Sequence, residues 1–260
     1  MPYATAGDCR IYYETDGRGS VDGTETVVFL GDLGFGPWQW AWQAGSLAGP
    51  FETVVPTTRG CGRSDAPAGP YDVTDLVGDL EAVLADVGVR SAHLVGAGLG
   101  GLVAVHAARR LARPEKLVLL GTPPAGTEYD TEALAADPAD EAALRATTET
   151  ALSASFREAR PEAVDRIVGW RGDEDATPDA RTAQAAALRE ADATDWLYEV
   201  TNDALVVHGR ADEICPPAAG EALARDLPGG EFVGIDDAGH LVGIEAARPV
   251  NDRLHAFLGE

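Results

Sequence analysis

Among the five histidines of this 260-residue sequence, His240 has the setting of a reactive side chain. It follows an expected strand, Glu231–Ile235, and ends the glycine-containing loop Asp236–His240. The other four lie on expected strands or in helical patterns and are interpreted as structural: His93, His208, His106 and His255. An imidazole titrates near neutral pH and can take or give a proton, so His240 is the candidate general base.

A glycine cluster, Gly96 to Gly101, stands between an expected strand, Ala92–Val95, and an expected helix. One interpretation is a tight turn whose small residues let strand and helix approach closely. The alternative is a dinucleotide fingerprint, because the spacing also fits G-x-G-x-x-G. That pattern normally follows the first strand of its unit and needs a carboxylate about twenty residues on. Here several strands precede it, and the next strand ends Leu120-Gly121-Thr122-Pro123 without a carboxylate.

Short apolar segments alternate with helical patterns along most of the chain, which predicts crossover units and a mostly parallel sheet. The expected strands are Cys9–Tyr13, Thr26–Leu30, Thr53–Pro56, Ala92–Val95, Lys116–Leu120, Ala204–His208 and Glu231–Ile235. Several are continuous apolar runs, as expected for strands that are buried on both faces.

Residues 125–203 break this alternation with acidic helical patterns punctuated by prolines. We expect a helical cap here, inserted into a core made of residues 1–124 and 204–260. The alternative is a set of extra helices packed on the sheet.

The net charge of −23, with Lys116 as the only lysine, resembles the composition of proteins from salt-accumulating haloarchaea. An ordinary acidic cytosolic protein is the alternative. Nucleic-acid and anionic-membrane partners are not expected, since phosphate binding needs clustered basic residues.

The sequence has neither a secretory pattern nor an apolar run that could span a bilayer, so we expect a cytoplasmic protein. No metal or cofactor is expected, because the three cysteines lack metal-ligand spacing.

Five segments together resemble the α/β-hydrolase family, in the family's own order. They are Val27–Trp38, Pro56–Asp65, Gly96–Gly100, Val206–Pro216 and Asp236–His240. The resemblance covers nearly the whole chain outside the expected cap. It implies the α/β-hydrolase fold, a mostly parallel central sheet flanked by helices.

The resemblance also implies site residues. Asp212 and His240 match the acid and the base of the family's catalytic triad, while Gly98 stands where the nucleophilic serine belongs. The backbone amides of Leu33 and Leu99 match the two donors of the oxyanion hole. The chain departs from the family at Asp32, where glycine is usual; a carboxylate pointing inward there would oppose a developing oxyanion.

Three functions follow from this set of residues. The first is an enzyme in which the Asp212–His240 dyad activates water or abstracts a proton from a small carbonyl-type substrate, with the water in the space left at Gly98. The second is a non-catalytic member that binds a small molecule under the cap or recruits a partner. The third is an esterase or lactonase whose serine was replaced by glycine through engineering. In each case we expect a monomer.

Overall fold

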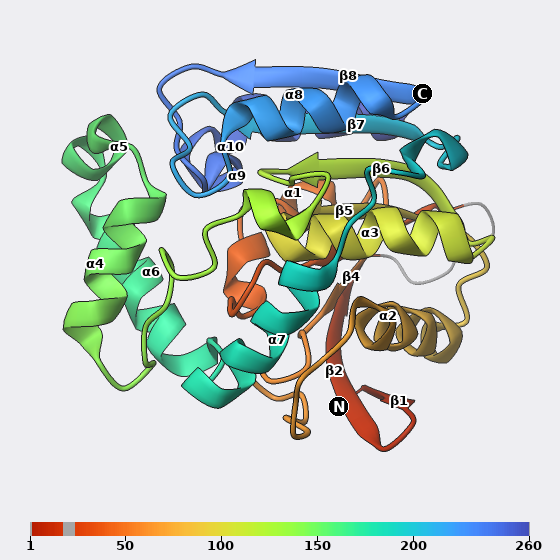
Figure 1. The fold of residues 1–260 in the computed structure, drawn as a ribbon, viewed down its shortest axis with the longest axis horizontal. Coiled ribbons are helices and arrows are strands. Elements are labelled where there is room, and N and C mark those ends of the chain that lie inside the picture. The colour runs from red at the N-terminus through yellow and green to blue at the C-terminus, as the bar shows by residue number, and fades with distance from the viewer. Residues whose placement is uncertain (1, 18–23, 260) are drawn as a thin grey trace.

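The computed structural model describes residues 2–17 and 24–259, and its centre is an eight-stranded sheet (Figure 1). The strand order is β1-β2-β4-β3-β5-β6-β7-β8. The strands are β1 (Tyr3–Ala6), β2 (Cys9–Asp16), β3 (Thr26–Leu30), β4 (Glu52–Pro56), β5 (Ala92–Ala97), β6 (Pro114–Leu120), β7 (Asp203–Gly209) and β8 (Gly229–Ile235). All pairs from β4 to β8 are parallel, whereas β1–β2 and β2–β4 are antiparallel. The prediction of an α/β-hydrolase fold with a mostly parallel sheet is confirmed.

Every strand expected from the sequence forms, with ends that differ by a few residues. Among the described strands, only β1 was not expected from the sequence; it has four residues and pairs with β2 at the edge of the sheet.

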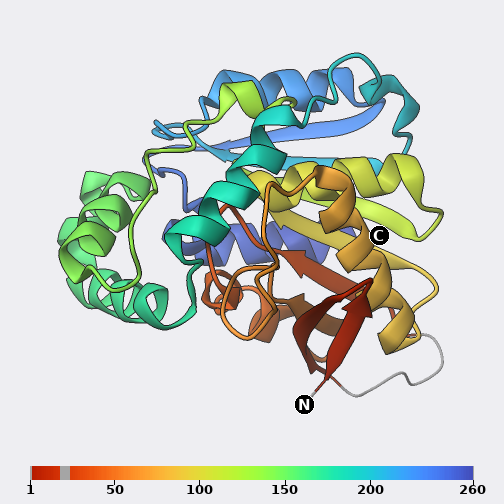
Figure 2. The same cartoon turned by 60° about the horizontal axis from the view of Figure 1, so that its bottom comes forward.

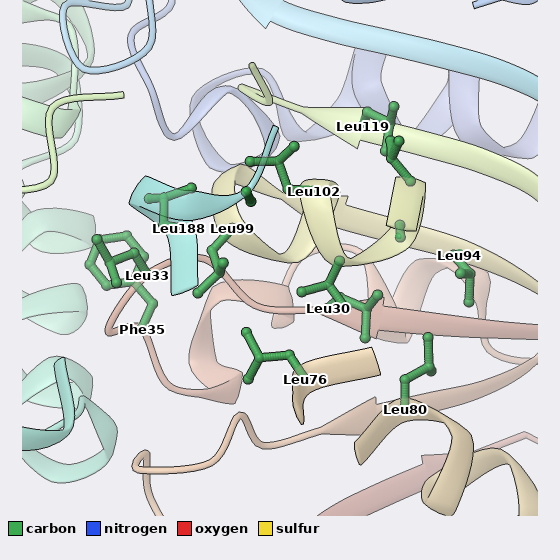
Figure 3. Close-up of a cluster of buried hydrophobic side chains, with 14 of the residues drawn as sticks. Leu30, Leu33, Phe35, Leu76, Leu80, Leu94, Leu99, Leu102, Leu119 and Leu188 are labelled. Atoms are coloured by element: carbon green, nitrogen blue, oxygen red, sulfur yellow. The ribbon is translucent and has the colours of Figure 1, made fainter. Parts of the chain in front are cut away.

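Side chains alternate between two hydrophobic clusters, one on each face of the sheet. On β3, Val28 and Leu30 join one cluster, whereas Val27 and Phe29 join the other. The first cluster is covered by α2 (Val73–Val87), α3 (Gly98–Arg110) and α8 (Pro217–Asp226), and the second by α1 (Ala44–Leu47), α9 (Val242–Glu245) and α10 (Ala247–Leu258). Figure 3 shows part of the first cluster, where leucines of the strands meet leucines of α2 and α3. Burial on both faces explains the continuous apolar runs in the sequence.

Helix α2 illustrates how local sequence sets an element. Its N-terminus is closed by a capping box, in which Asp72 accepts from the amide of Thr74 and Asp75 accepts from the amide of Asp72. It ends at Gly88, whose φ of 79° is left-handed. Its apolar face is buried between these ends.

Residues 125–203 are largely helical, as expected. They hold η2 (Gly126–Glu128), α4 (Glu141–Ala151), α5 (Ala154–Ala159), α6 (Pro161–Glu174), α7 (Pro178–Glu190) and η3 (Leu197–Glu199). Helices α4 to α6 lie beside the sheet, and α7 lies between them and α2 (Figures 1 and 2). Gln184 of α7 accepts from the amide of Gly34 and donates to the carbonyl of Arg59, each at 2.7 Å. The division of the chain into a core and a cap remains a prediction.

Within the described residues, no helix combines the length and the apolar character needed to cross a membrane.

A buried ion pair fastens the loop after β4 to α2. Arg59 makes two hydrogen bonds of 2.7 Å to the carboxylate of Asp79, and both side chains are only 10% exposed. Removing one partner of such a pair leaves an uncompensated buried charge, so Asp79→Ala should lower the free energy of unfolding by about 3–5 kcal/mol. The matched control is Asp165→Ala, which removes an exposed pair with Arg145, also at 2.7 Å, and should cost under about 1 kcal/mol. Urea unfolding of both variants checks this, and equal losses would contradict it.

Candidate active site

The turn between β5 and α3 places Gly98 at a position that rejects a side chain. Its φ of 45° is a left-handed conformation that favours glycine. A Cβ atom built on Gly98 would lie 1.8 Å from Oδ1 of Asp32, far inside any allowed contact. Two residues later, a Cβ on Gly100 would lie 2.1 Å from the carbonyl oxygen of Leu30. The glycines therefore let α3 approach both β3 and the loop that follows it.

Two backbone amides converge on one oxygen atom beside this turn. The amide of Leu33 donates to Oδ1 of Asp32 at 2.7 Å, and the amide of Leu99 donates to the same atom at 2.9 Å. The Leu99 amide belongs to the first turn of α3, where the helix dipole favours negative charge. The amides predicted to form an oxyanion hole thus lie together, and the Asp32 carboxylate occupies the space between them.

The imidazole of His240 lies between two carboxylates. Its Nδ1 is 2.8 Å from Oδ2 of Asp212, and its Nε2 is 2.8 Å from Oδ2 of Asp32. Tyr129 covers this arrangement: its hydroxyl donates to Oδ2 of Asp32 at 2.8 Å and lies 3.2 Å from Nε2 of His240. All four side chains are buried, with Asp32 fully inaccessible.

Asp212 is held from behind by its own loop. Its Oδ1 accepts from the amides of Ile214 and Cys215, at 2.9 and 3.0 Å. Nε2 of His208 lies 3.2 Å from Oδ2 and 2.8 Å from the carbonyl of Cys215. These contacts fix the carboxylate toward His240, and they show that the strand histidine His208 supports Asp212 directly.

The electrostatics of the site favour an imidazolium. Burial alone would lower the pKa of His240, but the charges and hydrogen bonds of Asp212 and Asp32 outweigh it and raise this pKa to about 10. Burial would raise the pKa values of the two acids, yet the hydrogen bonds and charge of His240 hold both below their usual range. Burial and Asp32 raise the pKa of Tyr129 well above its ordinary value. At neutral pH the site therefore contains a cation between two anions, under a neutral phenol.

This geometry corrects one expectation from the sequence. We expected the space left at Gly98 to hold a water molecule, but the carboxylate of Asp32 fills it. The reason is that Asp32 points inward, toward the two amides and His240.

The contacts of Tyr129 with Asp32 and of His208 with Asp212 were not predicted from the sequence. Tyr129 lies just past η2, in the segment that follows β6. Only the position of Tyr129 after a parallel strand could have indicated that it lies in the site, because segments that leave the carboxyl ends of parallel strands meet at one end of the sheet.

Another group of side chains has metal-ligand spacing. One ligand atom from each of Glu25, His93 and Glu115 lies within 4.8 Å of the others. They sit near the amino ends of β3, β5 and β6, at the opposite edge of the sheet from His240. Exposed acidic groups are common in proteins without a bound ion, and we assign no ion to these three residues.

Comparison with known proteins identifies the family. The model of the alpha/beta hydrolase family matches residues 27–253, which is most of the chain. The chain therefore belongs to the alpha/beta hydrolase family.

Similar proteins bear the names of different hydrolases. The 3-oxoadipate enol-lactonase 2 of Acinetobacter baylyi is 24% identical over 98% of this chain and 95% of its own. The crystal structure of the enol-lactonase from Burkholderia xenovorans LB400 has a TM-score of 0.87 with 26% identity, and the match covers 100% of both chains. RutD of Azorhizobium caulinodans, which bears the name of a carbamate hydrolase, is 33% identical over 45% of this chain and 42% of its own.

The raised pKa of His240 predicts how stability depends on pH. The pKa is about 10 in the folded protein and about 6.5 in an unfolded chain. A raised folded-state pKa means that this stabilisation is complete below pH 6.5 and is lost as the pH rises toward 10. The free energy of unfolding of wild type minus that of His240→Gln should therefore fall between pH 7 and 10. Urea unfolding across this range measures it; a constant difference would contradict the account.

The contact between Gly98 and Asp32 predicts that the two positions are coupled. Gly98→Ser alone should lower the free energy of unfolding by about 2–5 kcal/mol, because its Cβ clashes with Asp32 and its φ is strained. Adding Asp32→Gly removes the clash and should recover part of the loss. Urea unfolding of the single and double variants measures the coupling. If Gly98→Ser alone were as stable as wild type, the packing described here would be wrong.

Proposed function

We propose that the protein is a hydrolase in which Asp32 takes the place of the missing serine nucleophile, with Asp212 and His240 as the acid–base dyad. The observation that carries the proposal is that the two oxygens of Asp32 have different partners. Oδ1 accepts from the Leu33 and Leu99 amides, while Oδ2 faces His240.

The occupied oxyanion hole indicates which bond is broken. A substrate carbonyl could use the two amides only by displacing Asp32. The amides are instead placed to stabilise an oxyanion that develops on the carboxyl group of Asp32 itself. Such an oxyanion forms when water attacks an ester of Asp32. The substrate that forms this ester carries a leaving group on a saturated carbon.

In the first step, the carboxylate of Asp32 attacks the substrate and loses its negative charge. Oδ2 of Asp32 attacks the substrate carbon, the bond from that carbon to the leaving group breaks, and the leaving group departs with the bonding electrons. When the ester forms, the imidazolium of His240 loses the negative charge of Asp32 beside it, so its Nε2 proton passes to solvent and balances the charge of the departing X⁻. Tyr129 covers Oδ2 and must move aside for the substrate.

The second step uses the neutral imidazole produced by the first. The ester no longer carries the Asp32 charge, so one of the two causes of the raised His240 pKa is gone. His240, oriented by Asp212, then takes a proton from water, and the hydroxide attacks the ester carbon of Asp32. The oxyanion forms at Oδ1, between the two amides. Its collapse releases the alcohol, and the last proton exchange restores the carboxylate and the imidazolium. The sum is R–X + H₂O → R–OH + HX.

A small-molecule-binding protein without turnover is the second candidate. One observation favours it: both oxygens of Asp32 and both ring nitrogens of His240 already have hydrogen-bond partners. Ligand-induced thermal stabilisation without any product would support this candidate.

The third possibility, an engineered serine enzyme, receives little support from the packing. Because Asp32 fills the space beside Gly98, restoring a serine there would require a second change at Asp32.

Covalent trapping tests the proposed mechanism. Incubation with short 1-bromoalkanes or terminal epoxides should release bromide or diol with wild type. The same probes should leave a stable ester on Asp32 in His240→Gln, because that variant keeps the nucleophile but cannot activate water. Intact-mass and peptide mass spectrometry detect the adduct. In H₂¹⁸O, a single turnover of wild type should place ¹⁸O in the Asp32 carboxylate.

Asp32→Asn is the matched control, and it should give neither product nor adduct. Turnover by wild type without ¹⁸O in Asp32 would refute the nucleophile and indicate direct attack by water. Absence of both turnover and adduct across the probes, together with a ligand-induced melting shift, would favour the binding protein.

The finer expectations from the sequence are part of the same proposal. We propose a small-molecule site under a cap of residues 125–203, a monomer, a cytoplasmic location and a halophilic origin for the acidic composition.

A further inference from the structure

Arg181 of α7 is a buried guanidinium with unused hydrogen-bond donors. Only 7% of the residue is exposed. Its Nη2 donates to the carbonyl of Thr131 at 2.6 Å, whereas its Nε and Nη1 have no hydrogen-bond partner. Among the described residues it also has no salt-bridge partner within 4 Å. A buried charge without full pairing is costly, so these donors call for an explanation.

Arg171 of α6 is a second buried arginine in the same region, and its contacts are those of a structural residue. It is 2% exposed, and its Nε donates to Asp175 at 2.8 Å. Its Nη1 and Nη2 donate to three carbonyl or hydroxyl groups of α4 and to the carbonyl of Leu134. Each nitrogen of Arg171 therefore has a partner within the protein, and only one nitrogen of Arg181 does.

Arg181 lies between a cavity and the loop that follows β3. It lines a cavity of about 290 Å³ between α7 and the segment Thr131–Asp137. At its other side, its side chain lies against the loop after β3, with Nη1 3.6 Å from the position of a Cβ on Gly34. Burial lowers the pKa of Arg181, but Tyr129 and Asp32 are close enough to oppose that effect.

The other charged residues of the cavity are already engaged. Arg189 donates to Glu132 at 2.6 Å and to Thr131 at 2.7 Å. Asp137 accepts from the amide of Ala139 at 2.9 Å. Among the described residues, Arg181 is thus the basic residue of this cavity that has no carboxylate partner.

We infer that Arg181 binds a carboxylate group of the substrate, so that the protein acts on small molecules that carry an anionic end. The claim that the bound molecule is a substrate rests on the proposed function. The claim that a binding site exists rests only on Arg181 and its cavity. The carbonyl of Thr131 accepts only one of the two Nη2 hydrogens, so one edge of the guanidinium keeps two parallel N–H groups, which match the two oxygens of a carboxylate. The positive charge of Arg181 interacts with the charge of Asp32, so it also offsets the repulsion between an anionic substrate and the carboxylate nucleophile.

Butyrate and butyramide test the inference, because they have nearly the same size and differ in charge. At matched ionic strength, butyrate should raise the melting temperature of wild type in a concentration-dependent way, and butyramide should not. Arg181→Met should weaken butyrate binding by about tenfold or more. Arg189→Met, the matched control at the same cavity, should keep most of the affinity, since Arg189 is already paired.

Stability without ligand separates a binding role from a structural one. Arg181→Met should leave the melting temperature near or above that of wild type, because it removes an incompletely paired buried charge. Arg171→Met should lower it clearly, because five hydrogen bonds are lost. An equal fall in both variants, or equal effects of butyrate and butyramide on wild type, would overturn the inference.

These outcomes are independent of the trapping experiment. Selective butyrate binding that depends on Arg181, found together with no ester on Asp32, would sustain the carboxylate site and reject the nucleophile. An Asp32 ester without selective butyrate binding would do the reverse.

Discussion

A buried imidazole between two buried carboxylates is the interaction on which the rest of the site depends. Asp212 and Asp32 each lie 2.8 Å from one ring nitrogen of His240. Two buried carboxylates are tolerable only if a cation and several hydrogen bonds compensate them. The imidazolium supplies the charge, and four backbone amides together with Tyr129 supply the hydrogen bonds. Neutral imidazole would leave a pair of like charges without compensation.

The same constraint explains why Gly98 and Asp32 occur together. In a serine hydrolase, a hydroxyl group stands at the elbow and a small residue in the facing loop. Here the side chain comes from the other partner. Gly98 at the elbow has no side chain, and Asp32 in the facing loop carries a carboxylate that reaches the imidazole of His240. The Leu33 and Leu99 amides and the imidazole of His240 all contact oxygens of Asp32. In the mechanism proposed above, an oxygen of Asp32 therefore replaces the serine hydroxyl as the nucleophile.

The sequence predicted the strands and the glycine turns. It did not predict the directions in which individual side chains of the site point. Apolar runs and glycine turns predicted the sheet, since burial on both faces leaves a local signature, whereas β1 is too short to give one. Asp212 and His240 were placed by the motifs around them. The direction of the Asp32 side chain could not be predicted, because it depends on contacts with residues far away in the sequence. Arg181 resembled any charged residue on an amphipathic helix, and only packing reveals its unused donors.

The protonation state of His240 at slightly alkaline pH tests the central claim most directly. In ¹⁵N NMR at pH 8, both ring nitrogens of His240, assigned by their absence from the spectrum of His240→Gln, should carry protons. In Asp32→Asn the imidazole should lose a proton at a lower pH than in wild type. A neutral imidazole in wild type at pH 8, or the same titration in both proteins, would contradict an imidazolium held between Asp32 and Asp212.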